Sequence, residues 1–342
     1  MLTERQLLIL QVIVDDYIRY AEPVGSRSIS KREGVAFSAA TIRNEMADLE
    51  ELGYIEKPHS SSGRIPSQKG YRFYVDHLLL PHQLTEEELQ KIRSLYEMRI
   101  EELEEVIQHT AKILSQVTSY ISVVLGPELL DTKLRHVQII SLSKTKAVVI
   151  IVLDTGQVEN YLITMPEGIA ASELEKIANI LNERLKGLTL NQVRKVINQE
   201  IGEVMKAHVK NYQAFLDVIN RALESHRREK VFYSGKTNLL TQPEFRDVEK
   251  VRSIYSYLEE EKLVQKLFRS NQSGVQVKIG QENELEAFQN CSIITATYSI
   301  GDNKGTIGIL GPTRMEYDRV ISIVDYLSKK LTEALTNLYQ RD

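Results

Sequence analysis

The sequence predicts an α+β protein, with a compact helical module at the N-terminus and an antiparallel sheet covered by helices after it. Within residues 3–52, apolar residues recur at helical spacing in segments separated by turn residues. From residue 135 the pattern changes to β-rich runs joined by short turns, and such runs return between 274 and 310. Helices that cover a sheet are the economical way to bury both kinds of apolar surface.

Residues 38–55 have the pattern of a DNA-reading helix that runs into a β-hairpin. Ser38 is placed to cap the helix, because its hydroxyl can accept first-turn backbone N–H groups. Apolar residues at helical spacing form one inward stripe, made of Ile42, Met46, Leu49 and Leu52. The outward positions carry small residues beside an arginine and an asparagine, namely Ala40, Arg43, Asn44 and Ala47. Since Arg can fork onto guanine and Asn onto adenine edges, this face suits the major groove.

The flanking segments complete a winged helix-turn-helix. A capping-box pattern starts a first helix at Thr3, and this helix ends before Pro23. A short second helix is predicted at 26–31. Two extended pieces at 54–57 and 64–66, joined by a serine-rich turn, predict the wing.

The wing and the helix after it carry cations and no acids between residues 57 and 75, namely Lys57, Arg64, Lys69 and Arg72. Such a patch, with aromatic residues interleaved, can hold a phosphate backbone. We assign bases or nearby phosphates to Ser38, Thr41, Arg43 and Asn44, with Arg27 supporting them from the second helix. We assign the DNA backbone or the minor groove to Lys57, Gly63, Arg64 and Arg72. The alternatives are a packing module with merely solvated charges, or a winged helix that contacts protein.

Composition excludes several classes of protein. The chain has 342 residues, 42% of them hydrophobic, which predicts two or three domains rather than one core. Its net charge of −4 means that a local basic patch must hold any nucleic acid. The single cysteine, Cys291, rules out an intrachain disulfide and fits a reducing cytosol. No leader is seen, and the longest aliphatic run, 147–153, is too short to cross a bilayer, so we expect a cytoplasmic protein.

A connecting helix is predicted for residues 83–125, after a boundary near Pro81. Its apolar residues alternate steps of four and three and form a seam, made of Leu103, Ile107, Thr110, Leu114, Val117, Ile121 and Val124. Such a seam suits the packing of helix on helix. The seam pairs this helix with a second subunit, or it packs the helix on its own domain, and the sequence leaves both open.

The β-rich runs divide into two groups. Those at 135–142, 146–153 and 158–164 predict an antiparallel meander, which a helix at 172–186 follows. The second group lies at 274–279, 292–299 and 304–310, before a final amphipathic helix.

These patterns predict four parts of the chain: a DNA-binding module at 1–82, a connecting helix at 83–125, a split sheet domain at 126–187 and 274–342, and a mainly helical insertion at 188–273. The split sheet domain looks like a GAF-like domain. The alternative to a separate inserted domain is that residues 188–273 form a lid or an elaboration of the same core.

The sequence carries no constellation for catalysis. The fragment at 235–237 lacks the earlier glycine of a phosphate-binding loop, because that position is Lys230. The seven histidines show no helix-face metal spacing, and no nucleophile elbow or dinucleotide fingerprint is present. We therefore expect neither an enzyme nor a bound metal or cofactor.

A small-ligand pocket in the sheet domain is an open possibility. Tyr161, Tyr298, Gly305 and Gly308 are its candidate lining, and core or turn roles are the favoured alternative. A regulator that responds to a small molecule is accordingly the second candidate function.

Several motifs closely resemble the HrcA family of heat-inducible transcription repressors. They are PVGSR at 23–27, the helix and strand at 38–55, SGRIP at 62–66, KGYRFYVD at 69–76 and GTIGILGPTRMEY at 305–317. The resemblance spans essentially the whole chain, with mild departures at 60–62 and at Glu316. It implies a homodimeric repressor, with the insertion accompanying dimerisation. It also implies binding to the CIRCE inverted repeat upstream of chaperonin and chaperone operons, loss of repression on heat shock, and a GroEL chaperonin that helps to maintain the active form.

Overall fold

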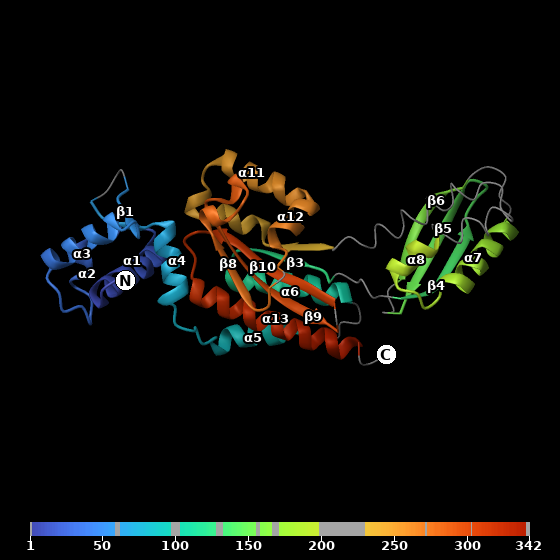
Figure 1. The fold of residues 1–342 in the computed structure, drawn as a ribbon, viewed down its shortest axis with the longest axis horizontal. Coiled ribbons are helices and arrows are strands. Elements are labelled where there is room, and N and C mark those ends of the chain that lie inside the picture. Colours follow the sequence, from blue (N-terminus) through green and yellow to red (C-terminus); the bar gives the residue numbers. More distant parts are fainter. Residues whose placement is uncertain are drawn as a thin grey trace. The chain divides into compact units, whose positions relative to one another are not determined.

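The protein forms two compact units. The computed structural model describes residues 2–58, 62–96, 103–127, 133–154, 158–165, 171–197, 230–270, 272–301 and 303–339. The larger unit comprises Met1–Gly126, Val231–Tyr298 and Gly305–Leu338, and the smaller unit comprises Pro127–Lys230, Ser299–Lys304 and Tyr339–Asp342. Helices and antiparallel strands both contribute to the fold (Figure 1), so the predicted α+β class is confirmed.

The N-terminal part of the larger unit is a winged helix-turn-helix. Its elements are α1 (Glu4–Tyr20), α2 (Ser26–Ile29), α3 (Ala39–Glu51), β1 (Ile55–Glu56), β2 (Ile65–Pro66) and α4 (Gln68–His77). The predicted capping box starts α1, with the Gln6 N–H donating to the Thr3 hydroxyl and the Thr3 N–H to the Gln6 side chain. The apolar stripes of α1 and α3 are buried against each other, as Ile9, Ile13 and Ile42 illustrate.

The wing is short and tied to the loop before α2. β1 and β2 pair antiparallel, with Ile55 opposite Pro66. Val24 and Arg64 exchange two backbone hydrogen bonds of 2.8 and 2.9 Å, which extends the wing by one bridge. The predicted wing turn at 59–61 lies outside the described residues.

A GAF-like domain with a five-stranded sheet makes up the rest of the larger unit. The strand order is β7 (Val231–Ser234), β3 (Ile121–Leu125), β10 (Asn303–Pro312), β9 (Cys291–Ile300) and β8 (Val275–Ile279). One face carries α5 (Glu86–Tyr96), α6 (Leu103–Thr118) and α13 (Tyr317–Tyr339), and the other carries α11 (Val248–Glu259) and α12 (Glu261–Phe268) (Figure 1). Short 3₁₀ turns lie at η2 (Lys236–Thr241), η3 (Pro243–Phe245), η4 (Gly280–Glu282) and η5 (Glu286–Phe288).

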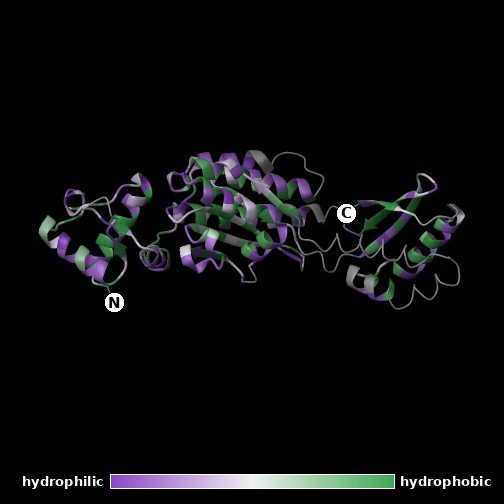
Figure 2. Ribbon diagram, turned by 90° about the horizontal axis from the view of Figure 1, so that it is seen from above, coloured by the Kyte–Doolittle hydropathy of each residue, from purple (hydrophilic) through white to green (hydrophobic). Residues whose placement is uncertain are grey.

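In the ribbon coloured by hydropathy, hydrophobic residues are frequent along the strands, and the helices alternate hydrophobic and hydrophilic residues (Figure 2). On β3 the two faces are used by different helices. Ile121, Val123 and Leu125 join the cluster with α11 and α12, whereas the Ser122 hydroxyl donates to the Ala111 carbonyl of α6. None of the helices in the described ranges is long and apolar enough to cross a bilayer.

The predicted seam at 103–124 is divided between a helix and a strand. α6 ends at Thr118, whose hydroxyl donates to the Leu114 carbonyl (2.6 Å), and Ser119 then takes a φ of 58°. Ile121 and Val124 lie in β3, so the prediction of one continuous helix is wrong. A strand that is buried on both faces is apolar at every position. Its residues therefore also satisfy the apolar spacing of a helix, and the sequence alone does not distinguish the two. Because α6 packs on β3 and β7, the seam serves its own domain, as the second interpretation had it.

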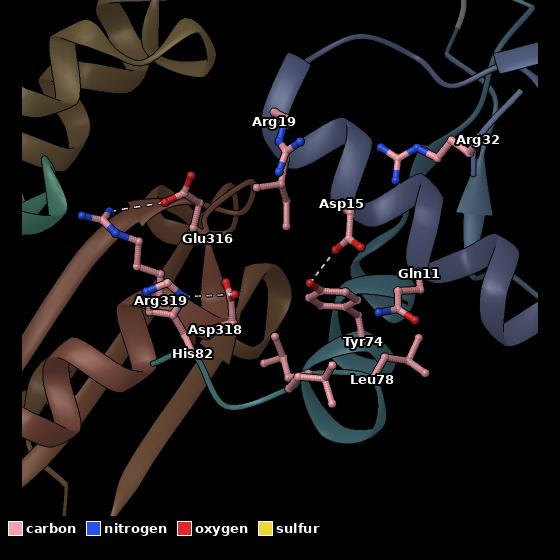
Figure 3. Close-up of a pocket in the computed structure, with 13 residues that line it drawn as sticks. Gln11, Asp15, Arg19, Arg32, Tyr74, Leu78, His82, Glu316, Asp318 and Arg319 are labelled. Carbon is pink, nitrogen blue, oxygen red and sulfur yellow. Dashed lines mark hydrogen bonds and ion pairs between the residues drawn. The ribbon is translucent and has the colours of Figure 1, made fainter. Parts of the chain in front are cut away.

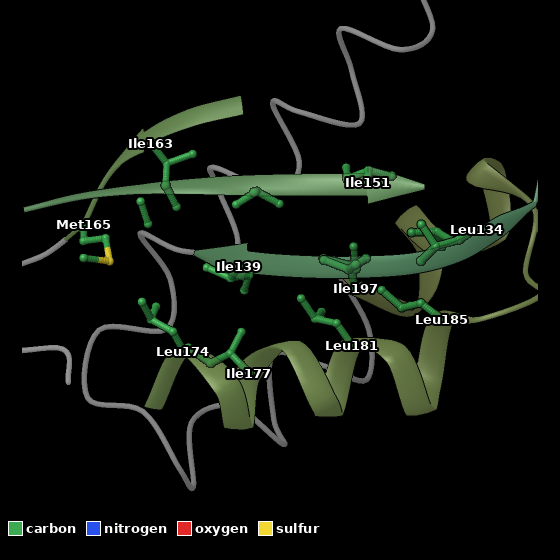
Figure 4. Packing of buried hydrophobic residues seen from close by; sticks show 14 of the residues in the cluster. Leu134, Ile139, Ile151, Ile163, Met165, Leu174, Ile177, Leu181, Leu185 and Ile197 are labelled. Atoms are coloured by element: carbon green, nitrogen blue, oxygen red, sulfur yellow. The ribbon is translucent and has the colours of Figure 1, made fainter. Parts of the chain in front are cut away.

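The smaller unit contains the predicted meander. Its elements are β4 (Leu134–Ser141), β5 (Lys146–Leu153), β6 (Val158–Thr164), α7 (Ala171–Leu185) and α8 (Leu190–Val196). One face of the sheet packs on α7 and α8 around Ile139, Ile151 and Leu181 (Figure 4). The Asn182 side chain of α7 bonds to both backbone groups of Val137, at 2.8 and 2.7 Å.

The predicted domain boundaries differ from this grouping. The meander forms a sheet of its own instead of joining strands β8 to β10, and the segment at 231–273 belongs with the five-stranded sheet. The inserted part is therefore 127–230 and not 188–273. Consecutive strands usually share a sheet, but that rule does not identify which distant strands they join. In the first part of the insertion predicted at 188–273, the structure describes α8, and residues 198–229 lie outside its description.

The residues considered for a ligand pocket are core residues. Tyr298 is 1% exposed and donates a hydrogen bond to the Leu125 carbonyl (2.9 Å). Gly305 lies against the Tyr298 ring, and a Cβ at Gly308 would lie 2.5 Å from the Phe268 ring. Tyr161 belongs to the smaller unit. The glycines therefore make room for the domain's own aromatic rings, which supports the core interpretation.

We expect Gly305→Ala to destabilise the protein by about 1–3 kcal/mol, because the added methyl group would overlap the buried Tyr298 ring. Urea unfolding measures this difference. The matched control is Lys304→Ala at the exposed neighbouring position, which should change stability by less than about 0.5 kcal/mol. Equal stability of the two variants would contradict tight packing at Gly305.

Candidate nucleic-acid interface

Helix α3 presents an exposed arginine and asparagine beside small residues. Ile42, Met46 and Leu49 are buried and fix which way the helix faces. Arg43 and Asn44 are exposed on the opposite side. Within the described part of the chain, neither side chain has a hydrogen-bond or ion-pair partner. Both are thus available to an external ligand.

Ser38 and Thr41 form the N-terminal cap of α3. The Ser38 hydroxyl accepts the Thr41 N–H at 3.1 Å, and the two hydroxyls are 2.9 Å apart. This arrangement satisfies one of the first-turn N–H groups of the helix. The structure therefore gives both residues a capping role, and the assigned contacts with bases or phosphates stay predictions.

Arg27 and Lys57 are both exposed, on α2 and just after β1 respectively. The backbone carbonyl of Arg27 accepts a hydrogen bond from the Ser30 hydroxyl (3.1 Å), and no partner of its guanidinium is found among the described residues. Their positions fit the assigned contacts with the DNA backbone, which the structure does not test.

Arg64 lies at the base of the wing and binds Glu50 of α3. Its Nε and Nη2 are 2.9 and 2.7 Å from Glu50 Oε2, and its side chain is 20% exposed. Its Nη1 donates to the backbone carbonyls of Ser62 and Gly63. In this conformation the guanidinium joins the wing to the reading helix, and its assigned contact with the DNA backbone or the minor groove stays a prediction.

Gly63 permits the close approach of two backbone segments. A Cβ at this position would lie 2.8 Å from the Pro23 carbonyl carbon and oxygen. The bridge between Val24 and Arg64 follows directly from this contact. Gly63 is therefore required for the attachment of the wing, whereas a backbone contact with DNA was the predicted role.

Arg72 faces the GAF-like domain. Its Nε and Nη2 are 2.8 and 2.6 Å from the two carboxylate oxygens of Glu282, and Nη2 also donates to the Val277 carbonyl at 2.6 Å. Burial works against the charge of Arg72, but its hydrogen bonds to Glu282 and Asp76 prevail and raise its pKa. In this conformation Arg72 is engaged within the protein, and its assigned contact with DNA stays a prediction.

Lys69, counted in the basic patch, also serves the fold. Its Nζ donates to the Leu52 carbonyl at the end of α3 (2.8 Å) and lies 4.5 Å from the centre of the Tyr54 ring. Of the four cations between 57 and 75, Lys57 alone is left without such a structural contact among the residues described. The basic patch available to DNA is accordingly smaller than its composition suggested.

The aromatic residues interleaved with these cations are part of the core. Tyr71 and Tyr74 are 3% and 7% exposed, and Phe73 packs edge-on against Tyr54. The Tyr74 hydroxyl donates to Asp15 of α1 at 2.7 Å. Burial raises the pKa of Asp15, while this hydrogen bond opposes the change. Base stacking on these rings is therefore not available in this conformation.

Sequence reasoning missed two polar side chains that link the winged helix-turn-helix to the GAF-like domain. Gln68 contacts the backbone at Gln281 and Gln289, and Arg314 donates to the Ile18 carbonyl at 2.7 Å. Each partner lies more than 200 residues away along the chain, so no local pattern identifies it.

Metal binding and thiol chemistry have little support among the described side chains. No group of three His, Cys, Asp or Glu residues there is arranged to hold a metal ion. Burial raises the pKa of Cys291 to about 12, so its thiol stays protonated at neutral pH.

Comparison with known proteins identifies relatives over the full length. The family model described as the HrcA protein C terminal domain matches residues 104–321. The chain is 59% identical to the heat-inducible transcription repressor HrcA of Halalkalibacterium halodurans, and the match covers 100% of both chains. It is 51% identical to the protein of the same name from Bacillus pumilus, over 99% of each chain.

A solved structure of the same architecture also matches. It is described as a hypothetical protein at 2.2 Å resolution, shares 26% identity, and superposes with a TM-score of 0.65 over 99% of this chain and 100% of its own. The sequence relatives, which extend through the winged helix-turn-helix as well as the domains after it, decide the assignment. The chain belongs to the HrcA family of heat-inducible transcription repressors.

Proposed function

We propose that this protein represses chaperonin and chaperone operons by binding the CIRCE inverted repeat as a homodimer in the cytoplasm, and that it releases the repeat on heat shock. Repression of heat-shock genes, in place of catalysis, follows from its membership of a family of transcription repressors. The proposal goes beyond the family assignment in naming the operator, the dimer and the GroEL chaperonin as a partner.

The exposed Arg43 and Asn44 of α3 carry the DNA-binding part of the proposal. They project from a helix whose other face is locked into the core, which is the geometry that a recognition helix requires. Ala40 and Ala47 on the same side leave room for the groove floor. We assign Arg43 and Asn44 to base edges, with Arg27 and Lys57 on flanking phosphates.

An apolar sheet face in the smaller unit supports a homodimer. α7 and α8 cover one face of the meander, whereas the other face exposes Ile140, Val158 and Leu162 by 41%, 56% and 64%. Ile140 and Leu162 both lie opposite Val148 in the sheet register, so they form one continuous apolar row. Exposed apolar patches of this kind mark interfaces, and a two-fold pair would match the symmetry of an inverted repeat. We therefore infer that a second copy of this chain covers this face.

Heat release and chaperonin dependence follow from marginal stability. A repressor that is stable by only a few kcal/mol loses its binding-competent state on modest heating. A chaperonin that binds the unfolded chain would govern how fast that state returns. Competition among other unfolded proteins for the chaperonin would then prolong derepression.

A small-molecule sensor is the second candidate function. The glycines expected to line its pocket are instead packed against the buried rings of Tyr298 and Phe268. This packing argues for the repressor without a ligand in that place.

Titration of the protein against the inverted repeat and a scrambled duplex tests DNA binding. The wild type should prefer the repeat, and Arg43→Ala should lose about 1–3 kcal/mol on the repeat with relaxed base preference. Lys57→Ala should weaken both duplexes similarly and lower the salt slope by about 1. An equal loss on both duplexes for Arg43→Ala would refute its base-reading role.

Replacing Leu162 by Glu should convert the dimer to monomers, because a charge would be buried at the β6 end of the apolar row. Sedimentation equilibrium measures this change. Asn179→Glu on the exposed side of α7 is the control and should leave the dimer intact. A dimeric Leu162→Glu variant would place the interface elsewhere.

Recovery of operator binding after a heat pulse should be faster and more complete with chaperonin and ATP than without them. Gel shifts at successive times after cooling measure it, with an equal mass of serum albumin as the control for crowding. The chaperonin part of the proposal fails when recovery is the same in both samples.

A further inference from the structure

Helix α4 is bound to the GAF-like domain by a polar contact that the DNA-binding role does not use. Arg72 forms a two-pronged contact with Glu282, and its Nη2 reaches the Val277 carbonyl of β8. Glu282 is held in place by the Ile279 N–H, which donates to its Oε2 at 2.8 Å. Two hydrogen bonds between planar groups fix orientation as well as distance.

A second contact lies one turn earlier on α4. The Gln68 side chain accepts the Gln281 N–H at 2.9 Å and donates to the Gln289 carbonyl at 3.2 Å. Gly280, with a φ of 56°, has no side chain in the way, and a Cβ there would overlap the Gln68 amide. We call the Arg72 and Gln68 contacts together the latch.

The opposite side of this junction is open. A cleft of about 440 Å³ lies between α1, α4, residues 78–82 and the start of α13. In Figure 3, Asp15 and Tyr74 line one wall, and Glu316, Asp318 and Arg319 line the other. Because a cleft separates the two parts on this side, the winged helix-turn-helix is oriented by the latch, the Arg314 bond to Ile18, and a contact between the Tyr71 and Tyr317 rings.

The latch leaves the reading helix uncovered. Arg43 and Asn44 stay exposed, while Arg72 and Gln68 project from α4 towards η4 and β8. Closing the latch therefore does not block DNA. It fixes the direction in which the reading helix points from the rest of the larger unit.

We propose that Arg72 and Glu282 are a positioning pair, which holds the winged helix-turn-helix at the angle needed for two copies to engage both half-sites together. The inference rests on the proposed dimeric repressor. A rigid arm raises the effective concentration of the second recognition helix at the second half-site, and a loose arm loses this advantage without losing any contact with DNA. Arg72 is thus a positioning residue, although its charge and its place beside the wing resemble those of a phosphate ligand.

Charge reversal separates these roles. Arg72→Glu and Glu282→Arg should each weaken binding to the full inverted repeat by roughly tenfold or more, with less than about a threefold effect on a duplex that carries one half-site. The double variant Arg72→Glu with Glu282→Arg should recover much of the loss, since the ion pair is restored in reverse. Glu284→Arg is the matched control, because Glu284 is two residues away and its nearest cation is Lys266 of its own domain.

A measurement without DNA follows the latch itself. Hydrogen exchange at the backbone amides of 277–283 should become faster in both single variants and return towards the wild-type rate in the double variant. Gly280→Ala should also make this exchange faster, because the added methyl group displaces Gln68 without changing any charge.

Three outcomes would overturn the proposal: full-repeat binding unchanged in Glu282→Arg, equal losses on the full repeat and the half-site, or hydrogen exchange that no variant alters. Failure of the proposed function is distinct from these. It would appear as a wild type that ignores the inverted repeat, with the exchange results still reporting whether the latch exists.

Discussion

Helix α4 packs against the winged helix-turn-helix and also binds the GAF-like domain, and the structure of the larger unit depends on this pair of contacts. One side of this ten-residue helix is built into the winged helix-turn-helix, where Tyr71 and Tyr74 are buried and Gly70 lets the helix approach the Tyr54 carbonyl. Its other side carries Arg72 and Gln68 to the GAF-like domain. Both cations of α4 are thus engaged within the protein, Arg72 with Glu282 and Lys69 with the Leu52 carbonyl. Among the described residues, the exposed cations assigned to DNA are therefore Arg27 of α2, Arg43 of α3 and Lys57.

Local features of this arrangement could be predicted from the sequence. The Ser38 cap, the Thr3 capping box and the inward stripe of α3 depend on residues three or four positions apart. The structure has both caps and buries Ile42, Met46 and Leu49, but Leu52, the last residue of the predicted stripe, caps the helix end and is 47% exposed. The roles of Arg64 and Arg72 could not be predicted in the same way. Their partners, Glu50 and Glu282, lie 14 and 210 residues away, and an arginine beside a wing has the same local pattern whether it binds a carboxylate or a phosphate.

Strands were easier to predict than sheets. The meander runs were found nearly to the residue because alternation along a strand is local. Assigning the meander to the GAF-like sheet failed because the true neighbours of β10 are β3 and β9, and β3 lies at the end of an apolar helical pattern. The glycines at 305 and 308 were ambiguous in a similar way, because their sequence pattern fits a ligand pocket and core packing equally well. Close backbone approach is what a glycine permits, and only the fold decides whether a ligand or a Tyr298 ring fills the space.

The small number of available cations limits the affinity of a single copy for DNA. Among the candidate DNA ligands in the described residues, Arg27, Arg43 and Lys57 are exposed cations, whereas Arg64 and Arg72 are bound within the protein. A protein with a net charge of −4 gains no general attraction to compensate. Each phosphate contact contributes modestly and is weakened by salt, so one copy on one half-site should bind weakly. Useful affinity must then come from joining two copies. In the proposed dimer, the apolar sheet face of the smaller unit joins the copies and the fixed angle of α4 orients their reading helices.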